Sequence, residues 1–82
     1  IQCFGSGMNE IGVGTAASAH FMASTSNVNY ELESASGIFF AKEDILVEPL
    51  SVRSGFLEVP EKNGLGVELD QAKIKKYSKK EW

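Results

Sequence analysis

The most informative stretch of the sequence is Gly5-Ser6-Gly7-Met8-Asn9-Glu10-Ile11-Gly12-Val13-Gly14, in which Glu10 lies between two pairs of glycines. The apolar residues of 1–5 before it predict a strand, and the small residues of 13–25 after it predict a helix. A strand that ends in glycines and leads into a helix lets the backbone approach a ligand closely, with free N–H groups directed toward it. A carboxylate in that place suggests a function, and the structural alternative is a capping carboxylate for the helix.

Length and composition limit the classes of protein that remain. The 82 residues allow one small domain, and the 43% of apolar residues is ordinary for a globular chain. No apolar run reaches the roughly 18 residues that a membrane span needs, so we expect no membrane contact. The single Cys3 excludes an internal disulfide, fits a reducing, cytoplasmic location, and is expected to be buried in the first strand. The sequence starts at Ile1 without a basic leader, so we expect the chain to be cut from a longer protein.

The C-terminal residues 73–82 are basic, with five lysines against one glutamate in a chain of net charge −3. Lysines of this kind complement the C-terminal end of a last helix. Single-stranded nucleic acid would need a platform of aromatic side chains interleaved with them, and a single aromatic residue, Tyr77, lies between the lysines. We therefore expect no nucleic-acid partner.

The second half of the sequence predicts a hairpin and a short helix. Alternating apolar residues on both sides of Ser54-Gly55 predict the hairpin, and the residues 64–67 predict another loop of close approach. Asp70 is a candidate N-cap, and the helix after it would bury Ala72 or Lys73, Ile74 and Tyr77. A lone strand, a helix, a hairpin and a short helix do not enclose a core, so the missing partners should lie in another chain or in a preceding part of the protein.

The glycine-rich stretch partly matches two nucleotide-binding motifs. The run Gly12-Val13-Gly14-Thr15-Ala16-Ala17 fits the dinucleotide fingerprint G-x-G-x-x-A, with Glu31 or Glu33 about 20 residues later. The expected strand ends too early for that fingerprint, and no second βαβ unit follows, so dinucleotide binding is the weaker hypothesis. A phosphate-binding P-loop is excluded because Val13, and not lysine, follows Gly12.

Other polar residues give weaker indications. His20 lies within the expected helix and is interpreted as a packed or partly solvated side chain. The pairs Glu43-Asp44 and Glu31-x-Glu33 could offer carboxylates to a metal, but no neighbouring His, Asn or third acid completes a site, so both pairs are expected to be solvated. We therefore predict no metal site in this chain.

Two blocks of sequence carry a resemblance to a known family. The first is Met8-x-Glu10 followed by Gly-Thr-Ala-Ala-Ser-Ala-His-Phe over residues 14–21, and the second is residues 42–49 continued by Gly-Leu-Gly-Val-Glu-Leu-Asp over residues 64–70. In this order they resemble the C-terminal end of the enolase superfamily, in its muconate-lactonizing (muconate cycloisomerase) and mandelate racemase-like branch. The resemblance covers essentially all 82 residues.

This resemblance implies an α/β fold, as the C-terminal fragment of a modified TIM barrel of (β/α)7β type with a capping domain. Residues 1–30 would be the last barrel strand and its helix. Residues 31–82 would be a C-terminal extension of the same domain, with its hairpin and terminal helix packing toward the capping domain. Alone, the chain would be a small α+β piece.

The resemblance also implies a chemistry for the complete protein, an isomerase or lyase such as a cycloisomerase, racemase or dehydratase. In this family a divalent cation, usually Mg²⁺, binds a small carboxylate substrate while a base removes the α-proton. Glu10 would be catalytic, protonated or sharing a proton at the mouth of the last strand, and Ser6, Gly7 and Met8 would contact substrate. The metal ligands and basic lysines would lie in the remaining barrel, so the 82-residue chain alone is expected to be inactive.

The implied partners are the remaining N-terminal barrel, the capping domain and, as a homo-oligomer, further copies. A second hypothesis is a non-catalytic cassette that buries its strand edges by self-association.

Overall fold

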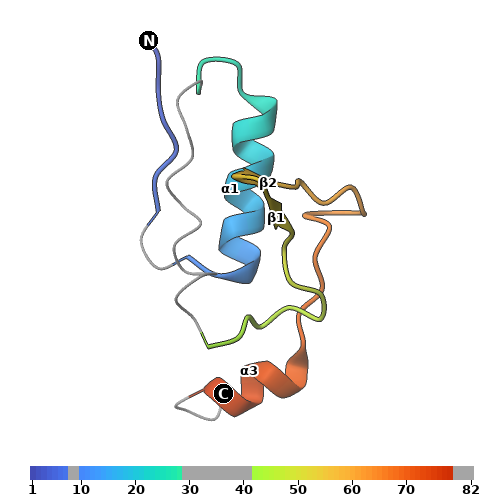
Figure 1. The fold of residues 1–82 in the computed structure, drawn as a ribbon. Helices are drawn as coiled ribbons and strands as arrows, with labels where there is room; N and C mark the ends of the chain where they lie inside the picture. The colour runs from blue at the N-terminus through green and yellow to red at the C-terminus, as the bar shows by residue number, and fades with distance from the viewer. Residues whose placement is uncertain (8–9, 29–41, 79–82) are drawn as a thin grey trace.

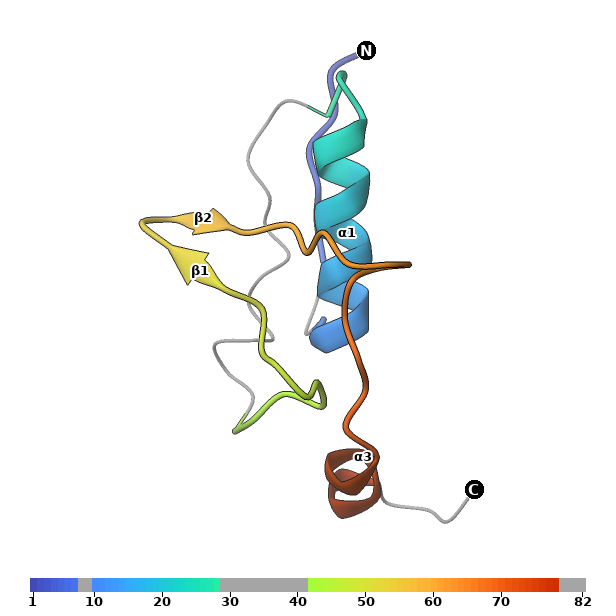
Figure 2. The same ribbon diagram turned by 90° about the vertical axis from the view of Figure 1, so that its right-hand side faces the viewer.

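The computed structural model describes residues 1–7, 10–28 and 42–78. The elements in this part of the chain are α1 (Gly12–Ser24), β1 (Val52–Arg53), β2 (Phe56–Leu57) and α3 (Gln71–Tyr77). The N-terminal segment runs alongside α1, and α3 lies beyond the end at which α1 begins (Figure 1). Figure 2 shows the hairpin of β1 and β2 projecting away from α1. The described residues therefore form a small unit of two helices and a hairpin.

Between described residues, the expected first strand shows one parallel bridge, from Cys3 to Val28. Two hydrogen bonds support it: Cys3 N donates to Asn27 O at 2.8 Å, and Asn27 Nδ2 donates to Ile1 O at 3.2 Å. The prediction of a buried Cys3 is wrong, because its side chain is exposed, as is that of Phe4. Among the described residues only the segment at 27–28 pairs with this stretch, and one neighbour cannot cover both edges of a strand.

The core is thin and centres on small residues of α1. Its buried apolar members are Ala16, Ala19, Val28 and Leu46, of which Leu46 is the largest and has no exposed surface. Leu46 forms an antiparallel bridge with Leu69, supported by a hydrogen bond from Val47 N to Glu68 O at 2.9 Å. The alanines of α1 let other segments approach the helix closely, so these segments form a core with few large side chains.

The predicted hairpin is confirmed. Val52 pairs with Leu57 and Arg53 with Phe56, so Ser54 and Gly55 form a two-residue turn. Both have positive φ, at 50° and 81°, which is the signature of a type I′ turn. Each strand has only two residues, and Phe56 is 78% exposed. The hairpin therefore presents apolar surface to solvent.

The predicted N-cap of the terminal helix is also confirmed. Asp70 Oδ1 accepts hydrogen bonds from Ala72 N at 3.0 Å and from Lys73 N at 3.2 Å. Lys73 turns inward and donates from Nζ to Leu46 O at 2.9 Å, while Ile74 is half-buried. Tyr77, predicted to face inward, is 40% exposed. The helix thus rests on the segment around Leu46 without burying a full face.

The glycine loop at 64–67 docks onto α1. Gly64 and Gly66 have φ of 65° and 77°, and a Cβ at Gly66 would collide with Pro60. His20 Nε2 of α1 hydrogen bonds with Leu65 O at 2.8 Å. The prediction of a close backbone approach is correct here, and what approaches is the protein's own chain.

Within the described ranges, no helix has the length and apolar character that crossing a membrane would require.

Candidate functional site

The candidate site lies where α1 begins. Gly12 opens the helix with φ of +45°, and Ile11 before it makes no side-chain capping bond. The cap comes from a distant carboxylate instead: Asp44 Oδ2, 32 residues further on, accepts from Gly12 N at 3.2 Å. The other oxygen, Asp44 Oδ1, accepts from Ile45 N at 2.7 Å. Asp44 therefore fixes the start of α1 against the C-terminal half of the chain.

This contact removes the basis for dinucleotide binding. The helix already begins at Gly12, so the glycines of the fingerprint lie inside the first turn and not in a turn between strand and helix. The Gly12 N–H, expected to be free for a ligand, is bonded to Asp44. A carboxylate at that position also repels a phosphate. Sequence reasoning missed Asp44 because no local pattern links it to a helix start 32 residues away.

Glu10 is half-buried beside the first turn of α1. Its main chain is held by Thr15, whose Oγ1 donates to Glu10 O at 3.2 Å. Its carboxylate lies against the helix at Gly14, where a Cβ would collide with Glu10 Oε2. No hydrogen bond joins this carboxylate to another residue of the described part of the chain, and Asp44 takes the N–H at Gly12. Among the described residues, the cap at Gly12 is therefore made by Asp44 and not by Glu10.

The three expected substrate contacts precede Glu10 along the chain. Ser6 is exposed and Gly7 is half-buried, while Met8 lies outside the described residues. No contact joins Ser6 or Gly7 to the Glu10 side chain among the described atoms. Their role at the substrate stays a prediction.

The described residues do not fit a divalent cation. No three side chains among His, Cys, Asp and Glu of the described ranges come close enough to share a metal ion. Asp44 already accepts two backbone hydrogen bonds, and Glu43 is engaged by α3. The expectation that Asp44 is solvated is wrong, because Asp44 is half-buried. Glu43 is exposed, as expected, although it has two side-chain partners. Glu31 and Glu33 lie outside the described residues.

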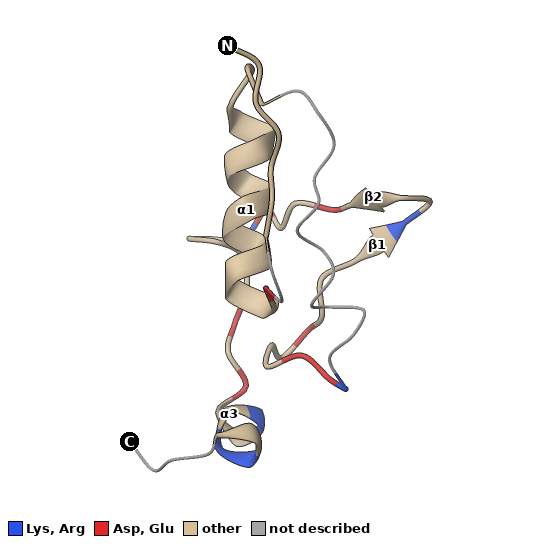
Figure 3. Ribbon diagram, turned by 90° about the vertical axis from the view of Figure 1, so that its left-hand side faces the viewer, with Lys and Arg blue, Asp and Glu red and all other residues tan. Residues whose placement is uncertain are grey.

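Glu43 ties α3 to the segment that carries Asp44. Tyr77 Oη donates to Glu43 Oε1 at 2.8 Å, and Lys76 Nζ lies 3.3 Å from the same oxygen. The Tyr77 hydroxyl, followed by Lys76, lowers the pKa of Glu43, and Glu43 in turn raises the pKa of Lys76. Figure 3 shows the basic residues of α3 facing acidic residues on the neighbouring segments. The contact is at the surface and serves to orient α3.

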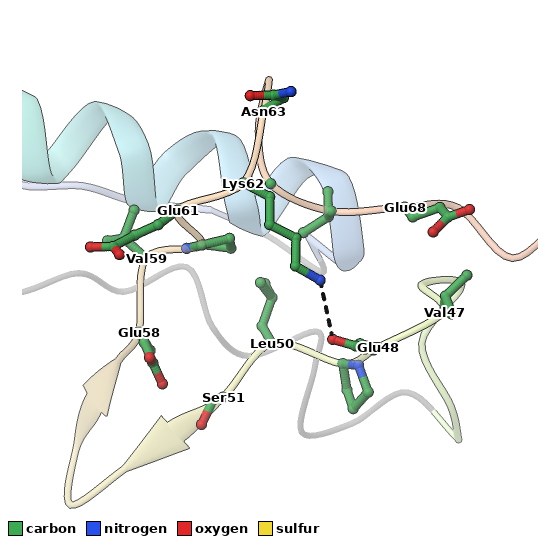
Figure 4. A pocket seen from close by; sticks show the side chains of 14 residues that line it. Val47, Glu48, Leu50, Ser51, Glu58, Val59, Glu61, Lys62, Asn63 and Glu68 are labelled. Atoms are coloured by element: carbon green, nitrogen blue, oxygen red, sulfur yellow. Dashed lines mark ion pairs between the residues drawn. The ribbon is translucent and has the colours of Figure 1, made fainter.

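A separate open groove of about 860 Å³ lies between the hairpin and the glycine loop, lined by residues 47–51, 58–63 and 66–68. Lys62 Nζ and Glu48 Oε2 pair across it at 3.6 Å, and both side chains are largely exposed (Figure 4). Glu10 does not line this groove. Its lining comes from three stretches between residues 47 and 68, and no sequence motif marks it.

Comparisons with a protein family and with individual proteins agree on the relatives of this chain. Residues 1–73 match the family described as enolase C-terminal domain-like. Muconate cycloisomerase 1-1 from Acinetobacter lwoffii is 37% identical over 79 residues, which are 96% of this chain and 21% of that protein. An o-succinylbenzoate synthase from Listeria innocua is 42% identical over 73 residues, covering 89% of this chain and 19% of that protein.

Solved structures show the same likeness. The muconate lactonizing enzyme from Klebsiella pneumoniae superposes with a TM-score of 0.88 at 35% identity, covering 98% of this chain and 22% of that one. The muconate cycloisomerase from Pseudomonas fluorescens gives a TM-score of 0.87 at 34% identity, with the same coverage. The chain thus spans about a fifth of the length of the proteins that it matches.

Proposed function

Because the chain belongs to the enolase C-terminal domain-like family, we propose that it forms the C-terminal part of a muconate cycloisomerase-like isomerase or lyase that depends on a divalent metal. The proposed reaction removes a proton α to a substrate carboxylate and stabilises the resulting enolate. The observation that carries the proposal is the half-buried Glu10 carboxylate, which lies at a glycine-flanked turn with no hydrogen bond to another described residue.

The proposed setting is the last strand and helix of a (β/α)7β barrel, formed by residues 1–30. The exposed apolar side chains support this setting: Ile1 is 107%, Phe4 59% and Phe21 56% exposed. Apolar surface of this extent on two adjacent segments calls for a covering partner. The remaining barrel strands and a capping domain would supply that cover, and further copies of the protein would complete a homo-oligomer.

Within this setting Glu10 would act on the substrate carboxylate. Its carboxyl group would hydrogen-bond or polarise the carboxylate side of the substrate, where negative charge develops, and such contacts are worth more in a dry site than in water. Ser6, Gly7 and Met8 would line the same mouth. A Mg²⁺ ion held by residues outside the described part of this chain would supply positive charge near the substrate.

The substrate class follows from what the relatives have in common. Their names refer to muconate and to o-succinylbenzoate, and both are carboxylates. We propose muconate and its lactone as the first candidate pair, since the matching solved structures are a muconate lactonizing enzyme and a muconate cycloisomerase. In that pair the lactone carries the proton α to the carboxylate, and in the opposite direction ring closure of muconate gives the enolate, which then takes up a proton. A reaction yielding o-succinylbenzoate is the second candidate, because relatives of that name match at comparable identity.

The test is proton exchange in D₂O by the complete protein that contains this chain. With Mg²⁺ and either carboxylate class, the protein should incorporate deuterium α to the carboxylate, and EDTA should abolish that incorporation. The 82-residue chain alone should incorporate none. A folded, Mg²⁺-loaded complete protein that neither exchanges nor converts either class of substrate would overturn the proposal, and a stable assembly of 82-residue chains alone would support a non-catalytic cassette.

A further inference from the structure

Gly14 lies inside α1 without a backbone reason to be glycine. The described glycines with positive φ are Gly12, Gly55, Gly64 and Gly66, so Gly14 has a conformation that any residue can adopt. Glycine within a helix is less stable than alanine, because it loses more backbone freedom on folding. A glycine at this position therefore weakens the first turn of α1 with no gain in local geometry.

The space around Gly14 supplies the missing reason. The three nearest atoms to a Cβ at position 14 all belong to Glu10: Oε2, with which it would collide, Cδ at 3.4 Å and Cβ at 3.9 Å. The other close glycines differ from this one. A Cβ at Gly12 would meet Asp44, Ile45 and Leu46, and one at Gly66 would meet Pro60. At Gly14 the described atoms nearest to the place of the absent methyl group belong to the Glu10 side chain.

The backbone on either side of this contact is fixed by other groups. Thr15 Oγ1 holds the carbonyl of Glu10 at 3.2 Å, and Asp44 holds the N–H of Gly12 at 3.2 Å. With the main chain held, the position of the carboxylate depends on which side-chain rotamers are open to Glu10. Because Gly14 has no side chain, Glu10 can adopt the rotamer in which its carboxylate lies along the helix.

We propose that Gly14 is a positioning residue for Glu10, and this inference rests on the catalytic role proposed for Glu10. A methyl group at position 14 would move the end of a flexible side chain and leave the core untouched. The fold would keep its stability, or gain some from the better helix former, while the carboxylate would leave its productive place. Catalysis depends on geometry within about 1 Å, so a displacement of the carboxylate by a methyl group at position 14 is enough to impair it.

The experiment compares Gly14→Ala, Glu10→Gln and the double variant in the complete protein, with Ala17→Gly as a matched change at an exposed position of α1. We expect Gly14→Ala to keep or raise Tm while kcat/KM falls at least tenfold. The double variant should be no slower than Glu10→Gln, and Ala17→Gly should keep its kcat/KM.

Four outcomes would overturn the inference. If Glu10→Gln loses activity and Gly14→Ala does not, the proposed function stands and the positioning role of Gly14 fails. If Gly14→Ala lowers Tm together with activity, or if the two losses multiply in the double variant, Gly14 acts on the fold and not through Glu10. If Glu10→Gln is fully active, the role of Glu10 fails, and that of Gly14 fails with it.

Discussion

Truncating Leu46 tests the packing that holds the start of α1 against the C-terminal half. Its side chain has no exposed surface, and its Cδ2 would lie 3.3 Å from a Cβ at Gly12. Leu46→Ala removes three carbon atoms, about 2.4 kcal/mol of transfer free energy at roughly 0.8 kcal/mol per carbon. The cavity left behind raises the expected loss to about 2–5 kcal/mol. A chain of 82 residues has only about 4–12 kcal/mol of unfolding free energy in total.

The assay is equilibrium unfolding in urea followed by circular dichroism. Leu65→Ala serves as the control, because it makes the same chemical change on a side chain that is 36% exposed. We expect Leu65→Ala to lose about 1 kcal/mol or less. Equal losses from the two variants, or a loss below about 1 kcal/mol from Leu46→Ala, would refute the view that one buried leucine anchors this core.

Three further predictions concern polar contacts. Asp70→Ala should lower the unfolding free energy by about 0.5–2 kcal/mol through loss of the helix cap, and an unchanged urea midpoint would contradict it. Asp44→Ala should lose a similar amount, and amide exchange at Gly12 should speed up; unaltered exchange there would speak against the cap. Glu43 has a pKa lowered from 4.5, so its contribution to stability is present above pH 4.5 and is lost as the pH falls through the lower folded value. Tyr77→Phe removes the leading donor and should raise the pKa of Glu43 measured by NMR, whereas an unmoved titration would show that the hydroxyl does not matter.

The parts of the fold that the sequence predicted correctly depend on neighbouring residues. The helix predicted over 13–25 is found over Gly12–Ser24, Asp70 caps α3, and Ser54-Gly55 forms the hairpin turn. Each depends on residues within one or two turns of chain, where local chemistry decides the conformation.

The parts that the sequence did not predict depend on distant contacts. Asp44 caps α1 from 32 residues away, and Gly14 accommodates the Glu10 carboxylate. Cys3 was expected to be buried because its neighbours are apolar, yet burial is decided by what covers a segment, and the described residues cover little of it. The resemblance to the enolase superfamily was correct because it depends on two blocks of sequence in order, which local patterns alone do not supply.

The candidate site depends on both halves of the chain. Asp44 holds the first N–H of α1, and Leu65 O holds His20 in the middle of the helix. The helix that follows Glu10 is therefore oriented by residues from the extension after it. That residues 1–30 and 31–82 belong to one domain stays a prediction.

The most direct measurement of the central claim is kcat/KM for Glu10→Gln in the complete, Mg²⁺-loaded protein. Glu61→Gln, the same change on an exposed glutamate that lines the separate groove, is the control. Glutamine can still donate a hydrogen bond from its amide, so Glu10→Ala is measured beside Glu10→Gln. Loss of the carboxyl group in Glu10→Ala should lower kcat/KM by about 10²-fold or more, with the control unchanged. Glu10→Gln and Glu10→Ala variants that both keep the full kcat/KM would remove Glu10 from the mechanism and contradict the account.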